Sequence, residues 1–165
     1  MTGWRTTVVL IGLWLLVGCT REELALPSED AIVEAFQSER PLSGEVTGNV
    51  AVLYVEQSFQ QLRRGGNLWA KVGPYIFLFS AEAQRLFDGY PGLVGIRVET
   101  RVGDATVASA VLMRDELSDL QWRRSLNIAG LARRDGTNRM TLLEDLVRWG
   151  EDHTLYEYNE RYTRR

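Results

Sequence analysis

The sequence predicts an α+β fold, in which an antiparallel sheet includes a hairpin over Leu93–Met113 and helices pack on one face of that sheet. Two patterns lead to this prediction. Apolar and polar residues alternate from Val94 to Val102, which is the period of a strand with one buried and one wet face. In the segment 140–147, apolar residues recur at helical spacing, which indicates an amphipathic helix.

The pair Gly103–Asp104 interrupts the alternating pattern and is typical of a two-residue hairpin turn. In a hairpin closed at this turn, the apolar residues of both strands lie on the same face of the sheet. The predicted partners are Val102 with Ala105, Thr100 with Val107, Val98 with Ser109, Ile96 with Val111 and Val94 with Met113. A slip of one residue would turn this face toward water, so the pattern predicts the register as well as the hairpin.

A short helix is predicted ahead of the sheet. Ser28 is a favourable N-cap, Ile32 and Phe36 supply an apolar stripe, and Pro41 marks the end of the helical pattern.

The region Ser43–Ser80 fits more than one type of secondary structure. Val50–Val55 is rich in β-branched residues, which favours a strand, and Lys71–Phe79 is predicted as a strand that is apolar on both faces. Gly65–Gly66 would then close a hairpin between them. The segment Glu56–Arg64 fits either a strand or a helix, because its apolar residues also have helical spacing.

The second half of the chain combines helices with the hairpin. Ser80 is expected to cap a short helix, and a longer helical segment is expected from Arg114 to a break at Asp135–Gly136. A further helix should follow and end at Gly150. The tail Thr154–Arg165 fits an edge strand, a helix or a loose end.

The first residues have the properties of an export signal. Arg5 gives a small positive region, and the run from Val8 to Gly18 is apolar over 11 residues. A membrane-spanning helix needs roughly 20 apolar residues, whereas the apolar region of a signal peptide has about 7–15. Small Gly18 stands directly before Cys19, where a peptidase pocket would need a small side chain.

The sequence Leu16-Val17-Gly18-Cys19 resembles the lipobox of bacterial lipoproteins. This resemblance implies cleavage between Gly18 and Cys19, a diacylglyceryl group on the Cys19 sulfur, and often a fatty acid such as palmitate on the new amine. Thr20, rather than Asp, follows the cysteine, which implies the outer membrane in a cell that has two membranes. The alternative is an ordinary secretory signal or short anchor with a chance cysteine.

The resemblance divides the chain into a cleaved signal over residues 1–18, a lipidated tether over residues 19–27 and one α+β domain over residues 28–165. Removing 18 of the 165 residues leaves 147, which suits a single domain with its own core. Loss of Arg5 changes the net charge from −3 to −4, which does not suggest nucleic acid as a partner. Cys19 is the only cysteine, so its lipidation would leave no thiol for catalysis, metal binding or a disulfide.

No catalytic residue, metal ligand or cofactor is predicted. His153 is the only histidine and is expected to be a solvated surface residue, because a metal site normally draws on several ligands. Paired acids could serve a glycoside hydrolase, but adjacent acids usually belong to a solvated face. These pairs are Glu22–Glu23, Asp115–Glu116, Glu144–Asp145 and Glu151–Asp152.

Aromatic and basic residues are the candidates for a binding surface. Tyr75, Phe77 and Phe79 are expected in the core, whereas three tail tyrosines are candidates for a partner surface. These tail residues are Tyr156, Tyr158 and Tyr162. The arginines are expected to be dispersed surface charges, although a patch near anionic headgroups is the alternative. They are Arg63, Arg64, Arg114, Arg123, Arg124, Arg133 and Arg134.

These observations predict a non-enzymatic binding or accessory protein of the bacterial envelope, held at the membrane by lipid on Cys19. Such a protein would support an assembly, contact an envelope protein or hold a ligand near the membrane. The first alternative is an envelope hydrolase that uses carboxylates on glycan or peptide. The second is a structural spacer.

Overall fold

The computed structural model describes residues 24–36 and 42–164 and shows a five-stranded sheet in the order β1-β2-β3-β4-β5. The strands are β1 (Leu42–Thr47), β2 (Val50–Glu56), β3 (Gly95–Val102), β4 (Ala105–Met113) and β5 (Leu155–Tyr158). Neighbouring strands are antiparallel except β2 and β3, which are parallel. The predicted α+β class is confirmed.

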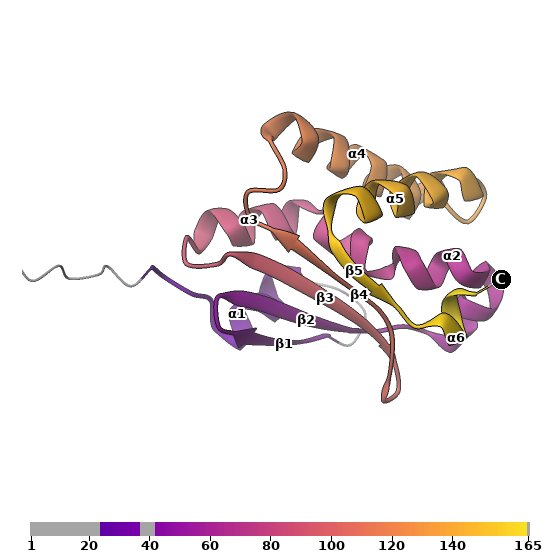
Figure 1. The fold of residues 1–165 in the computed structure, drawn as a ribbon, viewed down its shortest axis with the longest axis horizontal. Coiled ribbons are helices and arrows are strands. Elements are labelled where there is room, and N and C mark those ends of the chain that lie inside the picture. The colour runs from indigo at the N-terminus through magenta and orange to yellow at the C-terminus, as the bar shows by residue number, and fades with distance from the viewer. Residues whose placement is uncertain (1–23, 37–41, 165) are drawn as a thin grey trace, which may run out of the picture.

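Helix α1 precedes the first strand, helices α2 to α5 lie in two of the connections between strands, and α6 follows the last strand (Figure 1). They are α1 (Glu29–Phe36), α2 (Phe59–Leu78), α3 (Ala81–Gly89), α4 (Asp119–Asp135), α5 (Met140–His153) and α6 (Glu160–Thr163). Because β2 and β3 run in the same direction, the chain must return between them, and α2 and α3 form this crossover. Helices α4 and α5 connect β4 to β5.

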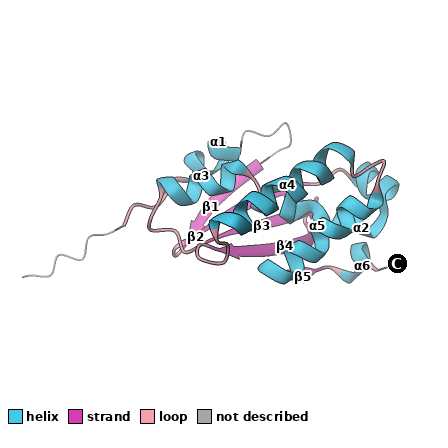
Figure 2. Cartoon of the chain, turned by 90° about the horizontal axis from the view of Figure 1, so that it is seen from above, coloured by secondary structure: helices cyan, strands magenta, loops and turns pink. Residues whose placement is uncertain are grey.

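Helices α2 to α5 lie together on one side of the sheet, as the two views at right angles show (Figures 1 and 2). The strand residues that face them are buried in one apolar core, and Leu53, Ile96 and Leu112 have no exposed surface. Ile32 and Phe36 of α1 join the same core. The arrangement of helices on one face of the sheet therefore follows the prediction.

The prediction of a strand over Lys71–Phe79 is wrong, because residues 71–78 form the second part of α2 and Phe79 is its C-cap. Gly65–Gly66 does not close a hairpin. The helix instead bends at Gly66, whose φ of 64° favours glycine. Tyr75 and Phe79 are almost fully buried because the sheet, α5 and α6 all pack on α2. A short helix segment buried on all sides loses its helical periodicity and resembles a central strand.

The segment Glu56–Arg64, which fitted either type, is therefore mainly helical. Strand β2 ends at Glu56 and α2 begins at Phe59.

The hairpin forms at Gly103–Asp104, but its predicted register holds only for the first pair, Val102 with Ala105. A β-bulge follows, and one extra residue, Val107, is inserted in β4. The observed pairs beyond it are Thr100 with Ala108, Val98 with Ala110 and Ile96 with Leu112. The bulge thus moves the buried face of β4 by one residue, and the other predicted pairs are wrong.

Two helix starts agree with the predicted caps. Ala31 N donates to Ser28 Oγ at 3.2 Å, and Ala83 N donates to Ser80 Oγ at 3.2 Å. Helix α4 begins later than predicted, because Ser118 and Gln121 form a capping box that starts the helix at Asp119.

Helix α5 continues past Gly150 to His153. The tail then forms the edge strand β5 followed by the short helix α6, so it combines two of the three alternatives left open by the sequence.

Candidate functional site

The side of the sheet that points away from the helices is called the open face here. Strand register places one row of its side chains across all five strands. This row consists of Ser43, Tyr54, Glu99, Ser109 and Glu157. No helix of residues 24–36 and 42–164 covers this row, and each of its members keeps some exposed surface.

Tyr54 is the centre of a polar network on the open face. Its hydroxyl donates to Glu45 Oε1 at 2.7 Å, and the guanidinium carbon of Arg101 lies 3.9 Å from the centroid of its ring. The hydrogen bond to Glu45 is the main cause that raises the pKa of Tyr54 above 10.0, and burial adds to it. The phenol therefore stays neutral and keeps its proton at ordinary pH.

Glu99 holds Arg101 against Tyr54. Arg101 Nε donates to Glu99 Oε1 at 2.8 Å, and Thr106 Oγ1 donates to the same oxygen at 2.6 Å. Burial alone would raise the pKa of Glu99, but these two hydrogen bonds and the charge of Arg101 outweigh burial and leave the pKa below 4.5. Glu99 is consequently a carboxylate over most of the pH range.

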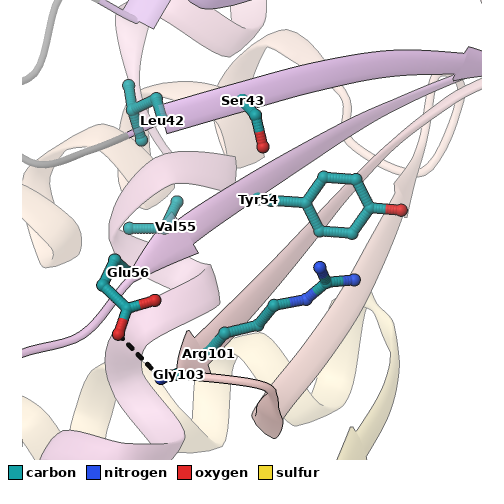
Figure 3. A pocket seen from close by; sticks show the side chains of 7 residues that line it. All are labelled: Leu42, Ser43, Tyr54, Val55, Glu56, Arg101 and Gly103. Carbon is teal, nitrogen blue, oxygen red and sulfur yellow. Dashed lines mark hydrogen bonds between the residues drawn. The ribbon is translucent and has the colours of Figure 1, made fainter.

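A pocket of about 250 Å³ lies beside this network, at the end of β2 (Figure 3). It is lined by Leu42, Ser43, Tyr54, Val55, Glu56, Arg101 and Gly103. Gly103 N donates to Glu56 Oε1 at 2.9 Å, which ties the hairpin turn to β2. Tyr54 and Arg101 extend side by side along one wall of the pocket in Figure 3.

This arrangement is suited to binding. The aromatic ring, the guanidinium and two carboxylates are held by one another, and 39% of the Arg101 side chain remains exposed. Tyrosine and arginine combine apolar contact area with hydrogen bonding, and both are enriched where proteins meet. The network is therefore the candidate binding site.

The sequence did not reveal this site. Alternation in β3 does place Glu99 and Arg101 on a wet face. The pairing of β3 with β2, which brings Tyr54 beside them, has no local sequence signal because the two strands are joined by a long helical crossover.

The three predicted tail tyrosines differ in exposure and in what they contact. Tyr156 is 43% exposed and its ring centroid lies 4.9 Å from that of Tyr158. The Tyr158 hydroxyl instead points to the core, where it lies 2.5 Å from the Tyr75 hydroxyl. Tyr162 is half-buried on α6. Tyr156 is the member of this set that offers most of its ring to a partner. The predicted lipidation and cleavage residues, Gly18 and Cys19, lie outside the described residues.

His153 is not the solvated residue that the sequence suggested, because only 15% of its side chain is exposed. Its ring centroid lies 4.2 Å from that of Trp149, and its Nδ1 lies 3.4 Å from Glu116 Oε1. The described residues contain no cluster of three or more histidine, cysteine or acidic side chains that could hold a metal ion.

Several of the arginines have structural partners. Arg114 donates to three backbone carbonyls, Arg133 donates to the Ile76 carbonyl, and Arg124 lies over the ring of Trp149.

The predicted core trio of Tyr75, Phe77 and Phe79 is buried as expected, although on a helix.

Within residues 24–36 and 42–164, no helix has the length and apolar character that a membrane span requires. The chain matches no known protein family, no curated protein and no solved structure.

Proposed function

We propose that this protein is a lipid-anchored lipoprotein of the bacterial envelope that binds a partner protein through the open face of its sheet. In a cell with two membranes its place is the outer membrane. The role is accessory: it supports an assembly and does not transform a substrate. The observation that carries the proposal is the Tyr54–Arg101 network, which is ordered on a sheet face that no described helix covers.

The network favours a protein partner because its side chains are already positioned. Binding normally costs about 0.5–1.5 kcal/mol for each flexible side chain that becomes immobile. Arg101 is already held by Glu99 and by the Tyr54 ring, so much of this cost is met in the free protein.

The anchor follows from the lipobox resemblance at Leu16–Cys19. A single acyl chain gives only marginal membrane binding at about 0.8 kcal/mol for each buried CH₂, whereas two or more chains hold a protein stably. The diacylglyceryl group on Cys19 would supply two acyl chains.

The anchor is tested with Cys19→Ser in the producing cell. We expect loss of lipid labelling and accumulation of the uncleaved precursor, measured by metabolic labelling with a fatty acid and by intact mass. Mature, membrane-bound protein from the variant would refute the anchor.

The partner site is tested by photo-crosslinking in intact membranes. A crosslinker at Ser43, on the open face, should capture a specific envelope protein, while one at exposed Arg148 on α5 should not. The proposed site would be contradicted if the protein with the crosslinker at position 43 were recovered without a crosslinked partner. Equal capture of a partner from positions 43 and 148 would contradict it as well.

The hydrolase alternative needs a carboxylic acid that stays protonated to act as a general acid. Glu45 and Glu99 flank the Tyr54–Arg101 pair, but the pKa of Glu99 is lowered, which is the wrong direction for that role. The spacer alternative predicts that substitutions on the open face leave function intact, and the crosslinking experiment separates it from partner binding.

A further inference from the structure

Exposed apolar side chains gather at one end of the domain. Leu24 is 56% exposed, Leu26 is 40%, Val94 is 46% and Met113 is 41%. Large apolar side chains that are scattered singly need no explanation, but a group at one site marks a contact surface.

Backbone contacts bring these four residues together. Gly92 N donates to the Ala25 carbonyl at 3.0 Å, which fixes the segment of Leu24 and Leu26 on the loop before β3. Val94 is two residues beyond Gly92 in that loop, and Met113 is paired with Gly95. The four are called the apolar end from here on.

Gly92 is required for this contact. A Cβ atom at that position would lie 2.5 Å from the Leu24 carbonyl oxygen and 2.7 Å from the Ala25 carbonyl oxygen, both of which are backbone atoms that cannot move aside cheaply. The last residues of the predicted tether are thus packed on the domain, and Pro27 is buried.

We propose that the apolar end rests on the lipid surface to which the protein is anchored. This inference depends on the proposed lipidation of Cys19. Five residue steps separate Cys19 from Leu24, and a fully extended chain of that length spans about 17 Å. The anchor therefore holds the apolar end close to the bilayer, where its exposed side chains leave water for the interface.

The same geometry directs the candidate binding site away from the membrane. Strand β2 begins next to the apolar end, since Val94 N donates to the Asn49 carbonyl at 2.8 Å. It ends at Glu56 in the pocket, about 20 Å further along the strand. The pocket and the turn at Gly103–Asp104 therefore lie at the far end of the sheet.

Charge around the apolar end favours zwitterionic lipid. Asp115 follows Met113 by two residues, Asp88 is next to Phe87, and both are exposed. The guanidinium of Arg114, the residue after Met113, is already bonded to the carbonyls of Phe87, Tyr90 and Leu93. An anionic surface would repel the two carboxylates.

The test uses the intact lipidated protein in phosphatidylcholine vesicles. Because Cys19 is the chain's only cysteine and carries lipid, Val94→Cys and Asp104→Cys each offer one free thiol for a nitroxide label. Val94 is exposed, and Asp104 lies at the far turn as the matched control. We expect the ratio of oxygen accessibility to polar-reagent accessibility to be several-fold higher at position 94 than at position 104.

Equal, water-like ratios at both positions in a chain shown by mass to be lipidated would overturn the membrane contact and leave the anchor standing. A mature chain without lipid would instead refute the anchor itself. Vesicles with added anionic phosphatidylglycerol should lower the ratio at position 94, and a higher ratio there would overturn the charge argument.

Discussion

The guanidinium carbon of Arg101 lies 3.9 Å from the centroid of the Tyr54 ring, and this contact joins β2 to β3 diagonally across the open face. Glu45 holds the Tyr54 hydroxyl on one side, and Glu99 holds the Arg101 Nε on the other. The stack therefore has a fixed orientation before any partner arrives.

Replacing Arg101 with alanine should strongly weaken partner capture and change folding stability little. The Arg101 side chain is 39% exposed and that of Glu99 is 16% exposed, so their ion pair is partly screened by solvent. Ion pairs at the protein surface contribute about 0.2–1 kcal/mol to stability, whereas a central interface arginine contributes about 2 kcal/mol or more to binding. Arg101→Lys should weaken capture as well, because an ammonium cannot reproduce the planar stack on Tyr54. The measurement is crosslinking yield together with urea unfolding.

Arg148→Ala is the matched control, because Arg148 is exposed on α5, away from the open face. Its crosslinking yield should equal that of the unchanged protein. Capture by Arg101→Ala at the same yield would remove the stack from the binding site.

Two helical glycines should respond to alanine in opposite directions. At Gly150 in α5 an added Cβ would lie 2.4 Å from the ring of Tyr75, which is fully buried and cannot move away. Overpacking of this kind costs about 1–3 kcal/mol. At Gly130 in α4 an added Cβ meets nothing within 4 Å, so the better helix propensity of alanine should stabilise the fold by about 1 kcal/mol.

The measurement for both glycine variants is the free energy of unfolding in urea. Similar values for Gly150→Ala and the unchanged protein would show that α5 does not pack on Tyr75 as closely as described.

In the hairpin, the sequence pattern predicts the position of the turn but not the pairing of the strands beyond it. The turn at Gly103–Asp104 was predictable because it interrupts a regular alternation of apolar and polar residues. The bulge was not, because Val107 and Ala108 are both apolar and both fully buried, so either one can occupy the inner face. Alternation alone cannot say which residue is the extra one.

The crossover helix and the candidate site were missed for a different reason, which is that both depend on tertiary contacts. Tyr75 and Phe79 are enclosed by elements from distant parts of the chain, so the apolar pattern of α2 resembles that of a strand. Tyr54 meets Arg101 only because β2 pairs in parallel with β3. Sequence patterns report the burial of a residue but not the strand beside which it lies.

The buried tyrosine pair should make the fold sensitive to alkali. Burial raises the pKa of Tyr75 and of Tyr158 well above 10.0, so the folded protein holds both protons more tightly than the unfolded chain. Their contribution is therefore fully present below pH 10 and is lost as the pH rises toward the folded pKa values. Urea unfolding at about pH 8 and about pH 11 should show a clear fall in stability.

The double variant Tyr75→Phe/Tyr158→Phe should show a smaller fall over the same pH interval, even if it is less stable throughout. Tyr156→Phe is the control, since Tyr156 is 43% exposed, and it should retain the full pH dependence. An unchanged fall in the double variant would assign the alkaline sensitivity to other groups.

Arg114 should prove to be the residue that holds the loop between α3 and β3. Its Nε, Nη1 and Nη2 donate to the carbonyls of Leu93, Phe87 and Tyr90. Arg114→Lys places one ammonium where three separate donors are needed. The Tyr90 carbonyl keeps its bond from Leu93 N at 3.0 Å, but the other two carbonyls lose their Arg114 donor. A buried acceptor left unpaired costs about 1–3 kcal/mol. We expect lower stability and faster amide hydrogen exchange at Gly92, whose N–H donates to Ala25.

The control for this prediction is Arg97→Lys, because Arg97 is exposed on β3 and its replacement keeps the charge. Hydrogen exchange at Gly92 should stay unchanged in that variant. If Gly92 exchanges equally slowly in Arg114→Lys, the contact between the loop and the residues before α1 is held by Gly92 packing alone, and Arg114 has no part in positioning the apolar end.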